Sequence, residues 1–214
     1  VGIDMEHIPY KGSGQTNIDL AAGRLAAGIV SISGLILVKA GKARMLATTL
    51  EFAQAAGFAE IILCCDPAPD DAAWQAQNLP ESVTCVAQGD GDLGERMQRA
   101  AEAALADHKA VILVGTDCVE LSSDWLREAS AALTEHDAVI HPSEDGGYTL
   151  LGLRQSHNSL FSALPWSTDA VATITYERLD ALGWNYQIRA LSHDIDTPED
   201  LIYLPDHWPL PMIR

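Results

Sequence analysis

The stretch AVILVGTDCVEL, residues Ala110 to Leu121, places an uninterrupted apolar run directly before Gly115-Thr116-Asp117. The β-branched residues of this run predict a strand that is buried on both faces. Asp117 then follows the carboxyl end of that strand, which is the edge where open α/β sheets bind ligands. Two explanations of Asp117 are open at this point: it caps a turn, or it takes part in metal or phosphate chemistry.

The composition is that of an ordinary globular protein with one large core. The chain has 214 residues, of which 48% are hydrophobic and 20% are charged, so we expect a single domain. Thirteen basic residues against 30 acidic ones give a formal net charge of −17. Such a surface repels a phosphate backbone, so we expect no nucleic-acid partner. An anionic small substrate would need a divalent cation to offset the local acids.

The cysteines and the hydropathy of the sequence indicate in which cellular compartment the protein is expected. The sequence has no apolar run of about 18 residues and no basic leader before an apolar segment, so we expect neither a membrane span nor a signal peptide. Cys64, Cys65, Cys85 and Cys118 show neither CxxC spacing nor a zinc-type pairing with His. We therefore expect reduced thiols in a cytoplasmic protein. The sequence leaves a homodimer open.

Strand and helix patterns alternate along the chain. Strands are predicted at residues 34–38, 60–65, 83–87, 110–114, 138–141, 148–153 and 188–191. Helices are predicted at residues 21–30, 45–56, 93–105 and 124–134, after Thr168 and from Pro198. Gly57 ends the second of these helices, and Gly183 ends the one after Thr168. Asp92 and Glu95 form a capping box before the helix at 93–105, and Ser122 or Ser123 caps the helix at 124–134. This alternation predicts an α/β fold: a three-layer α/β/α sandwich with a mostly parallel sheet.

Acidic residues follow several predicted strands. Asp117, Asp145 and the pair Asp194 and Asp196 each come after one. Because parallel strands end at one edge of a sheet, these carboxylates can converge on a divalent metal site with oxygen ligands. Two glycines follow Asp145, which indicates either a close approach of the backbone to a ligand or a plain hairpin turn. Asp90 precedes the capping box and has no such local explanation.

Five segments occur in an order that resembles one known family. They are QGDGDLGERM at residues 88–97, GTDC at 115–118, EDGGY at 144–148, WST at 166–168 and DIDTPEDL at 194–201. From about residue 45 to about residue 204 the chain resembles the radical-SAM/selenodomain-associated transferase family. This group is glycosyltransferase-like and has the GT-A fold of nucleotide-diphospho-sugar transferases.

The resemblance implies a metal-dependent transferase that uses a nucleotide-activated sugar or a related nucleotide. Asp117 and Asp196, with Asp194 behind them, would bind Mg²⁺ or Mn²⁺, which offsets phosphate charge and stabilises the leaving group. Asp145 would orient an acceptor or act as a base, which makes Asp117 and Asp145 the expected catalytic residues. The expected substrate-binding residues are Lys42, Arg44, Asp90, Gly146, Gly147 and Trp166. Glycosyl transfer and nucleotidyl transfer fit these residues equally.

Residues 1–44 depart from the family pattern. The family opens with a strand and a basic phosphate-binding loop that resembles PGxxKTRL. In this chain, residues Lys39 to Arg44 are a shortened remnant of that loop. The remnant either holds phosphate or forms a solvated loop. Residues of about 6–49 instead resemble a fragment of tripartite tricarboxylate transporter receptors, which indicates a fusion in front of a transferase domain at 45–214. The altered loop supports a second hypothesis, a GT-A-fold protein that binds a ligand without catalysis.

Overall fold

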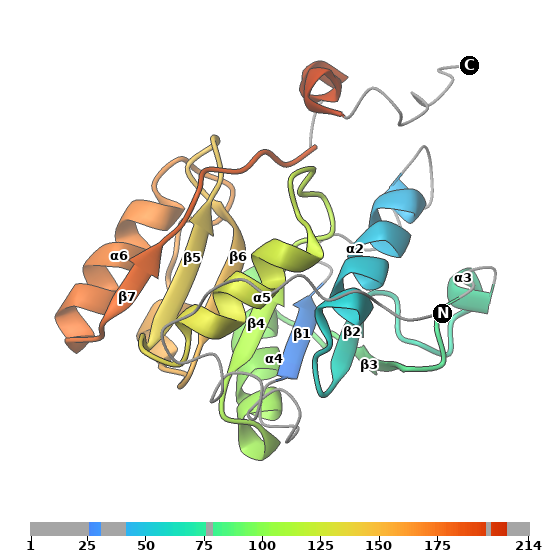
Figure 1. The fold of residues 1–214 in the computed structure, drawn as a ribbon, viewed down its shortest axis with the longest axis horizontal. Helices are drawn as coiled ribbons and strands as arrows, with labels where there is room; N and C mark the ends of the chain where they lie inside the picture. Colours follow the sequence, from blue (N-terminus) through green and yellow to red (C-terminus); the bar gives the residue numbers. More distant parts are fainter. Residues whose placement is uncertain (1–25, 31–41, 76–78, 196–197, 205–214) are drawn as a thin grey trace.

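The strand at the centre of the fold is β4 (Val111–Val114), all of whose residues are buried. A computed structural model, shown in Figure 1, describes residues 26–30, 42–75, 79–195 and 198–204 of the chain. Ile112 and Val114 belong to a hydrophobic cluster on one face of β4, and Val111 and Leu113 belong to a second cluster on the other face. The prediction of a strand covered on both sides is therefore confirmed.

One seven-stranded sheet contains this strand, in the order β3-β2-β1-β4-β6-β5-β7. The other strands are β1 (Ala26–Val30), β2 (Ile61–Cys65), β3 (Val83–Ala87), β5 (Ala138–Pro142), β6 (Tyr148–Leu153) and β7 (Tyr186–Ile188). β1, β2, β3 and β4 are parallel, and β5 is parallel to β7. β6 runs antiparallel to both of its neighbours, β4 and β5, so all the other strands of this sheet point the same way.

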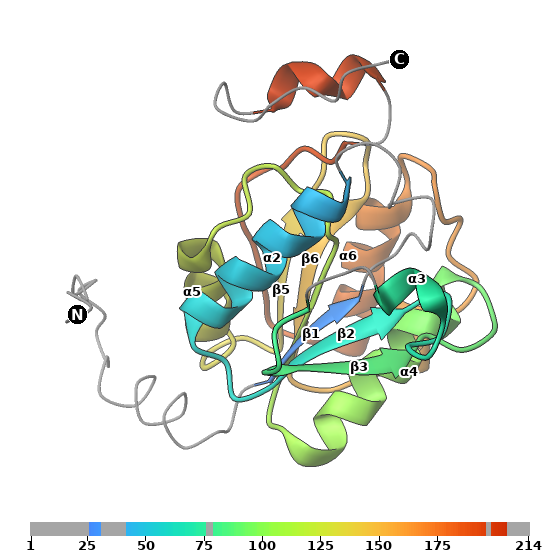
Figure 2. The ribbon, with the colours of Figure 1, turned by 90° about the vertical axis from the view of Figure 1, so that its right-hand side faces the viewer.

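Helices cover both faces of the sheet. They are α2 (Lys42–Ala56), α3 (Ala72–Gln75), α4 (Leu93–Asp107), α5 (Ser123–Ala132) and α6 (Val171–Leu182), with short 3₁₀ helices η2 (Asn158–Leu160) and η3 (Pro198–Tyr203). Leu50 of α2 and Leu126 of α5 belong to the cluster around Ile112, whereas Met97 of α4 and Leu179 of α6 belong to the other cluster. Figure 2 shows the resulting three layers, which confirms the predicted α/β/α architecture.

The predicted helix ends are largely confirmed by their backbone geometry. The Asp92 side chain accepts a hydrogen bond from the Glu95 amide and the Glu95 side chain accepts one from the Asp92 amide, which completes the capping box of α4. Ser122 caps α5. α2 and α6 end at glycines with positive φ, 80° at Gly57 and 67° at Gly183.

The prediction for residues 21–30 is wrong over Ala26–Val30, which form β1 and not a helix. β1 pairs with β2 on one side and with β4 on the other, so its backbone bonds come from partners that are distant in the sequence. These pairings outweigh the local helix preference of its alanines. Residues 21–25 and the predicted strand at 34–38 lie outside the described residues.

Two further boundaries differ from the predictions. α2 begins at Lys42, so Lys42 and Arg44 lie in the first turn of a helix and not in a loop. The last strand was predicted to begin at Ile188, but β7 ends there. The next residue still follows β5, because the Arg189 amide donates a hydrogen bond to the Ile140 carbonyl at 2.8 Å. The proposed domain boundary between residues 44 and 45 stays a prediction. β1, which precedes this boundary in the sequence, lies between β2 and β4 in the sheet.

Candidate active site

The order of the strands singles out one place on the sheet edge. From β1 the chain moves outward to β2 and β3, then returns to place β4 on the opposite side of β1. Ligands of open α/β sheets bind outside the carboxyl ends of the strands at such a reversal. Gly115 to Asp117 follow β4 at this point. We call this edge of the sheet, with the loops at residues 115–120, 143–147 and 192–195, the rim.

The structure brings Asp117 next to the segment that carries Asp194. The Ile195 amide donates to the Asp117 carbonyl at 3.2 Å, and the Val119 amide donates to the His193 carbonyl at 3.2 Å. Cys118 and Asp194 thereby form an isolated antiparallel bridge. Two of the three predicted metal ligands thus lie on directly paired segments. Asp196, the third, lies outside the described residues.

A small glycine lets the Asp117 carboxylate fold back over its own strand end. A Cβ atom added at Gly115 would lie 2.7 Å from Asp117 Oδ1, so a larger residue there would push the carboxylate away. The Gly115 amide donates to the Thr149 carbonyl at 2.9 Å, which extends the pairing of β4 with β6 past the end of β4. The backbone under Asp117 is therefore fixed by the sheet itself.

The donor chemistry of this pair suits a hard divalent cation. Mg²⁺ in proteins is commonly bound by one or two carboxylates together with water and substrate phosphates, so Asp117 and Asp194 fit that use. Within the described ranges, no group of three or more His, Cys, Asp or Glu side chains could hold a metal ion by itself.

Asp145 lies on the rim as predicted, within the turn between β5 and β6. Its Oδ1 accepts hydrogen bonds from the Ser143 hydroxyl and from the Gly147 amide, the latter at 2.9 Å. The Gly146 backbone has φ +89°, and a Cβ atom added there would lie 2.2 Å from the Asp169 carbonyl oxygen. Gly146 therefore has positive φ and lies close to the chain's own loop before α6, and its expected approach to a substrate stays a prediction.

Arginines of α4 hold the loop that contains Asp90. Arg96 donates to the Asp66 carboxylate at 3.0 Å, to the Gln88 side chain at 2.9 Å and to the Gly91 carbonyl at 3.0 Å. Arg99 donates to the Asp90 carbonyl at 2.8 Å. Asp90 itself is exposed. The two arginines of α4 therefore anchor the loop that carries Asp90.

The remaining predicted substrate-binding residues have different surroundings. Trp166 is half-buried and packs edge-on against Tyr148, with ring centroids 6.5 Å apart. Its Nε1 would lie 2.9 Å from a Cβ atom at Gly94, and it has no hydrogen-bond partner in the described part of the chain. Trp166 thus has a packing role at the start of α4. The side chains of Lys42 and Arg44 are outside what the structure describes.

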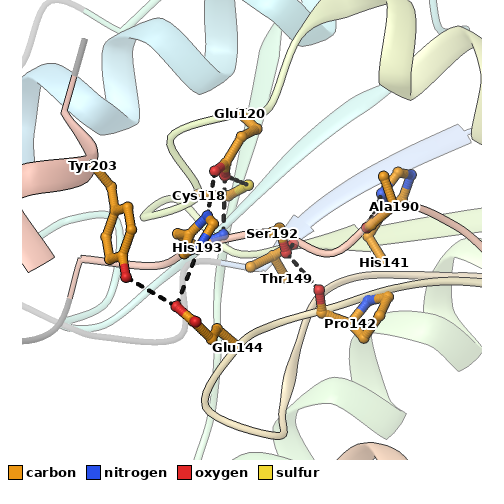
Figure 3. A network of polar contacts seen from close by, with 10 residues as sticks. All are labelled: Cys118, Glu120, His141, Pro142, Glu144, Thr149, Ala190, Ser192, His193 and Tyr203. Atoms are coloured by element: carbon orange, nitrogen blue, oxygen red, sulfur yellow. Dashed lines mark hydrogen bonds and ion pairs between the residues drawn. The ribbon is translucent and has the colours of Figure 1, made fainter.

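The rim also carries a polar cluster that sequence reasoning missed, drawn in Figure 3. His193 Nδ1 faces Glu120 Oε1, and the His193 amide donates to Glu120 Oε2 at 2.9 Å. His193 Nε2 lies 3.2 Å from Glu144 Oε2. The Tyr203 hydroxyl donates to the same Glu144 oxygen at 3.0 Å, and the Tyr203 ring stacks on His193 with centroids 4.0 Å apart.

Electrostatics in this cluster favour the charged imidazole. The hydrogen bond to Glu120, with the charges of Glu120, Glu144 and Asp194, raises the pKa of His193 against a smaller lowering by desolvation. Beside it, burial raises the pKa of the Cys118 thiol to about 12, so Cys118 stays protonated and inert as a nucleophile. Only the position of His193 immediately before Asp194 could have marked the cluster in the sequence, because its partners are far along the chain.

A second histidine lies beneath the rim in the layer between α5 and the sheet. His141 is 1% exposed, stacks on Trp125 with ring centroids 4.2 Å apart, and places Nδ1 3.1 Å from the Ala190 carbonyl oxygen. Because a carbonyl only accepts, Nδ1 carries the proton. Burial lowers the pKa of His141 to about 4, so the ring is neutral.

Comparison with known proteins places the chain in a family. The family model described as "Uncharacterized protein conserved in bacteria (DUF2064)" matches residues 49–168, more than half of the chain. The chain belongs to the DUF2064 family. The match includes Asp90, Asp117, Asp145 and Trp166, whereas Asp194 follows it. No curated protein sequence matches this DUF2064 chain significantly.

Solved structures with the same fold include several nucleotide-related enzymes. A candidate nucleotide-diphospho-sugar transferase from Desulfovibrio desulfuricans has a TM-score of 0.70 at 24% identity, over 84% of this chain and 85% of that one. The 4-diphosphocytidyl-2C-methyl-D-erythritol synthase from Anaerococcus prevotii has a TM-score of 0.59 at 15% identity, over 85% and 96%. Glucosyl-3-phosphoglycerate synthase from Mycobacterium tuberculosis, in complex with Mn²⁺, uridine diphosphate and glucosyl-3-phosphoglycerate, has a TM-score of 0.56 at 12% identity, over 93% and 81%.

These similarities confirm the predicted fold class, a nucleotide-diphospho-sugar transferase-like α/β sandwich. At such low identity they show the fold alone. The narrower resemblances, to radical-SAM/selenodomain-associated transferases and, over residues 6–49, to transporter receptors, stay predictions, as do the cytoplasmic location and the homodimer. Among the described residues, no helix has the length and apolar character to cross a membrane.

Proposed function

We propose that this DUF2064 protein is a metal-dependent transferase that acts on a nucleotide-activated sugar or a related nucleotide at the rim around Asp117. The observation that carries the proposal is the direct pairing of the Asp117 and Asp194 segments at the strand-order reversal between β1 and β4. The glucosyl-3-phosphoglycerate synthase structure, which has this fold and holds Mn²⁺ with uridine diphosphate, supports the choice of ligand class.

In this proposal Asp117, Asp194 and Asp196 would hold Mg²⁺ or Mn²⁺, which would neutralise phosphate charge and stabilise the phosphate group that leaves. The strongly acidic chain, with a net charge of −17, explains why the site uses a metal to admit an anionic substrate. Asp145, exposed on the same rim, would orient the acceptor or act as a base, and its Oδ1 is bonded within the turn by Ser143 and Gly147.

Calorimetric titration of nucleotides and nucleotide-sugars with and without Mn²⁺ tests the proposal. We expect binding by the wild type only with Mn²⁺, and at least about a tenfold loss, ~1.4 kcal/mol, in Asp117→Ala. Asp107→Ala is the control, because Asp107 is an aspartate that ends α4 at the opposite edge of the sheet, where it is exposed, whereas Asp117 is half-buried. No metal-dependent binding by the wild type would remove the enzyme proposal.

The products then separate the two transfer reactions. Glycosyl transfer from a nucleotide-sugar releases a nucleoside diphosphate or monophosphate, whereas nucleotidyl transfer from a nucleoside triphosphate releases pyrophosphate. Metal-dependent binding without either product would favour the second hypothesis, a binding protein without catalysis. The placement of Lys42 and Arg44 in the first turn of α2, and not in an open phosphate loop, is the observation that favours this alternative.

A further inference from the structure

His193 is held on three sides by groups from three different parts of the chain. Glu120 follows β4, Glu144 belongs to the β5–β6 turn, and Tyr203 ends η3. The side chain of His193 is 24% exposed, and those of Glu120 and Glu144 are 32% and 58% exposed. We call these four residues, His193, Glu120, Glu144 and Tyr203, the histidine clamp (Figure 3).

The clamp connects the same loops that carry the candidate site residues. Glu120 is close to Asp117, Glu144 precedes Asp145, and His193 precedes Asp194. Backbone bonds run alongside: the Glu144 amide donates to the Ser192 carbonyl at 3.1 Å, and the Val119 amide donates to the His193 carbonyl at 3.2 Å. An imidazole between two carboxylates therefore joins the three rim loops at one point.

Both ends of the DIDTPEDL segment are fixed by this arrangement. Asp194 and Ile195 are paired with Asp117 and Cys118 at one end. At the other end Tyr203 is stacked on His193 and bonded to Glu144. The described residues on both sides of positions 196 and 197 are thus attached to the same rim loops.

We propose that the histidine clamp is a positioning device that sets the rim loops, and the ends of the DIDTPEDL segment, in the arrangement that binds the metal–nucleotide complex. The inference rests on the proposed function. His193 is a positioning residue and not a catalytic one, because both of its ring nitrogens face carboxylate oxygens of the protein. Groups that orient the residues around a metal commonly change its affinity by about 10–100-fold when removed.

Hydrogen exchange tests the clamp without any substrate. In His193→Ala we expect faster exchange at the amides of Val119, Glu144 and Ile195, with no change in β4 or β6. Tyr203→Ala should speed exchange mainly at residues 193–195, and Tyr203→Phe, which keeps the stacked ring, should fall between it and the wild type. The control is His108→Ala: His108 Nε2 also pairs with a glutamate, Glu60, at 2.9 Å, but at the opposite edge of the sheet.

Calorimetry of Mn²⁺ with the nucleotide that the wild type binds gives the second readout. We expect the affinity to fall by about 10–100-fold in His193→Ala, less in Tyr203→Phe, and not in His108→Ala. Unchanged exchange at the rim in His193→Ala would overturn the clamp, and so would faster exchange with undiminished affinity. If the wild type binds no nucleotide, the proposed function fails by itself, and the exchange data alone decide whether His193 sets the rim loops.

Discussion

The buried ring of His141 makes the stability of the fold depend on pH in a defined direction. Burial lowers the pKa of His141 from 6.5 to about 4, while the unfolded chain leaves it at its ordinary value. Between these two values the unfolded state binds a proton that the native state does not, so stability falls as the pH falls. The contribution of His141 is fully present above pH 6.5 and is lost progressively toward pH 4.

The size of the effect follows from the pKa difference. One pKa unit corresponds to about 1.4 kcal/mol, and between pH 7 and pH 5 the ring of the unfolded chain becomes protonated while the buried ring does not. His141 alone therefore lowers the free energy of unfolding by about 2 kcal/mol over this range. His193 acts in the opposite sense, because its raised pKa stabilises the fold below pH 6.5 and that contribution is lost as pH rises through the folded-state pKa.

Urea unfolding at pH 7, 6 and 5, on the wild type and on His141→Asn, isolates the contribution. Asn can still donate to the Ala190 carbonyl, where His141 Nδ1 lies at 3.1 Å, but it does not titrate. Loss of the stack on Trp125 lowers the stability of the variant at every pH by a constant amount. We expect the fall from pH 7 to pH 5 to be smaller in the variant by about 2 kcal/mol. Equal falls in both proteins would refute the buried, neutral state of His141.

Two further predictions concern turns and caps. Gly146→Ala should lower stability by about 2 kcal/mol or more, read as a lower melting temperature, because it combines positive φ with a Cβ 2.2 Å from the Asp169 carbonyl oxygen. Gly57→Ala is the control: Gly57 has φ +80° and no atom lies within 4 Å of the added Cβ, so this variant should lose only about 1 kcal/mol of stability. An equal loss of stability in both variants would contradict the Asp169 contact. Asp92→Ala should destabilise by about 1 kcal/mol in chemical unfolding through loss of the α4 cap, whereas Asp90→Ala should stay within about 0.5 kcal/mol of the wild type. A similar loss at Asp90 would show that its side chain supports the loop.

Local sequence signals predicted the elements whose causes are local. The uninterrupted apolar run at residues 110–114 predicted β4, because a strand covered on both faces needs apolar side chains on both. Asp92 and Glu95, three residues apart, predicted the start of α4 through reciprocal bonds that form within one turn. Both signals depend on residues that are near neighbours, so both can be identified without the fold.

Features that depend on distant partners could not be predicted in this way. β1 carries alanines that locally favour a helix, and its strand conformation depends on pairing with β2 and β4 on either side. Glu120 and His193 are 73 residues apart, and no spacing rule connects them. The sequence left Gly146 open between a close approach to a ligand and a hairpin turn, and its close neighbour in the structure is Asp169, which only the packing of α6 brings there.

The structure divides the acids of the rim into two groups that the sequence could not distinguish. Glu120 and Glu144 face His193, and Asp145 bonds the backbone and hydroxyl of its own turn, so these three have structural partners that account for their positions. Asp117 and Asp194 differ in that their own backbone segments pair with each other at the strand-order reversal, and the charge of Asp194 also acts on His193. An acid after a strand is therefore a weak signal for metal chemistry by itself. A second acid on a segment that the fold pairs with the first is a stronger signal, and this pairing is the reason why the proposed metal site includes both Asp117 and Asp194.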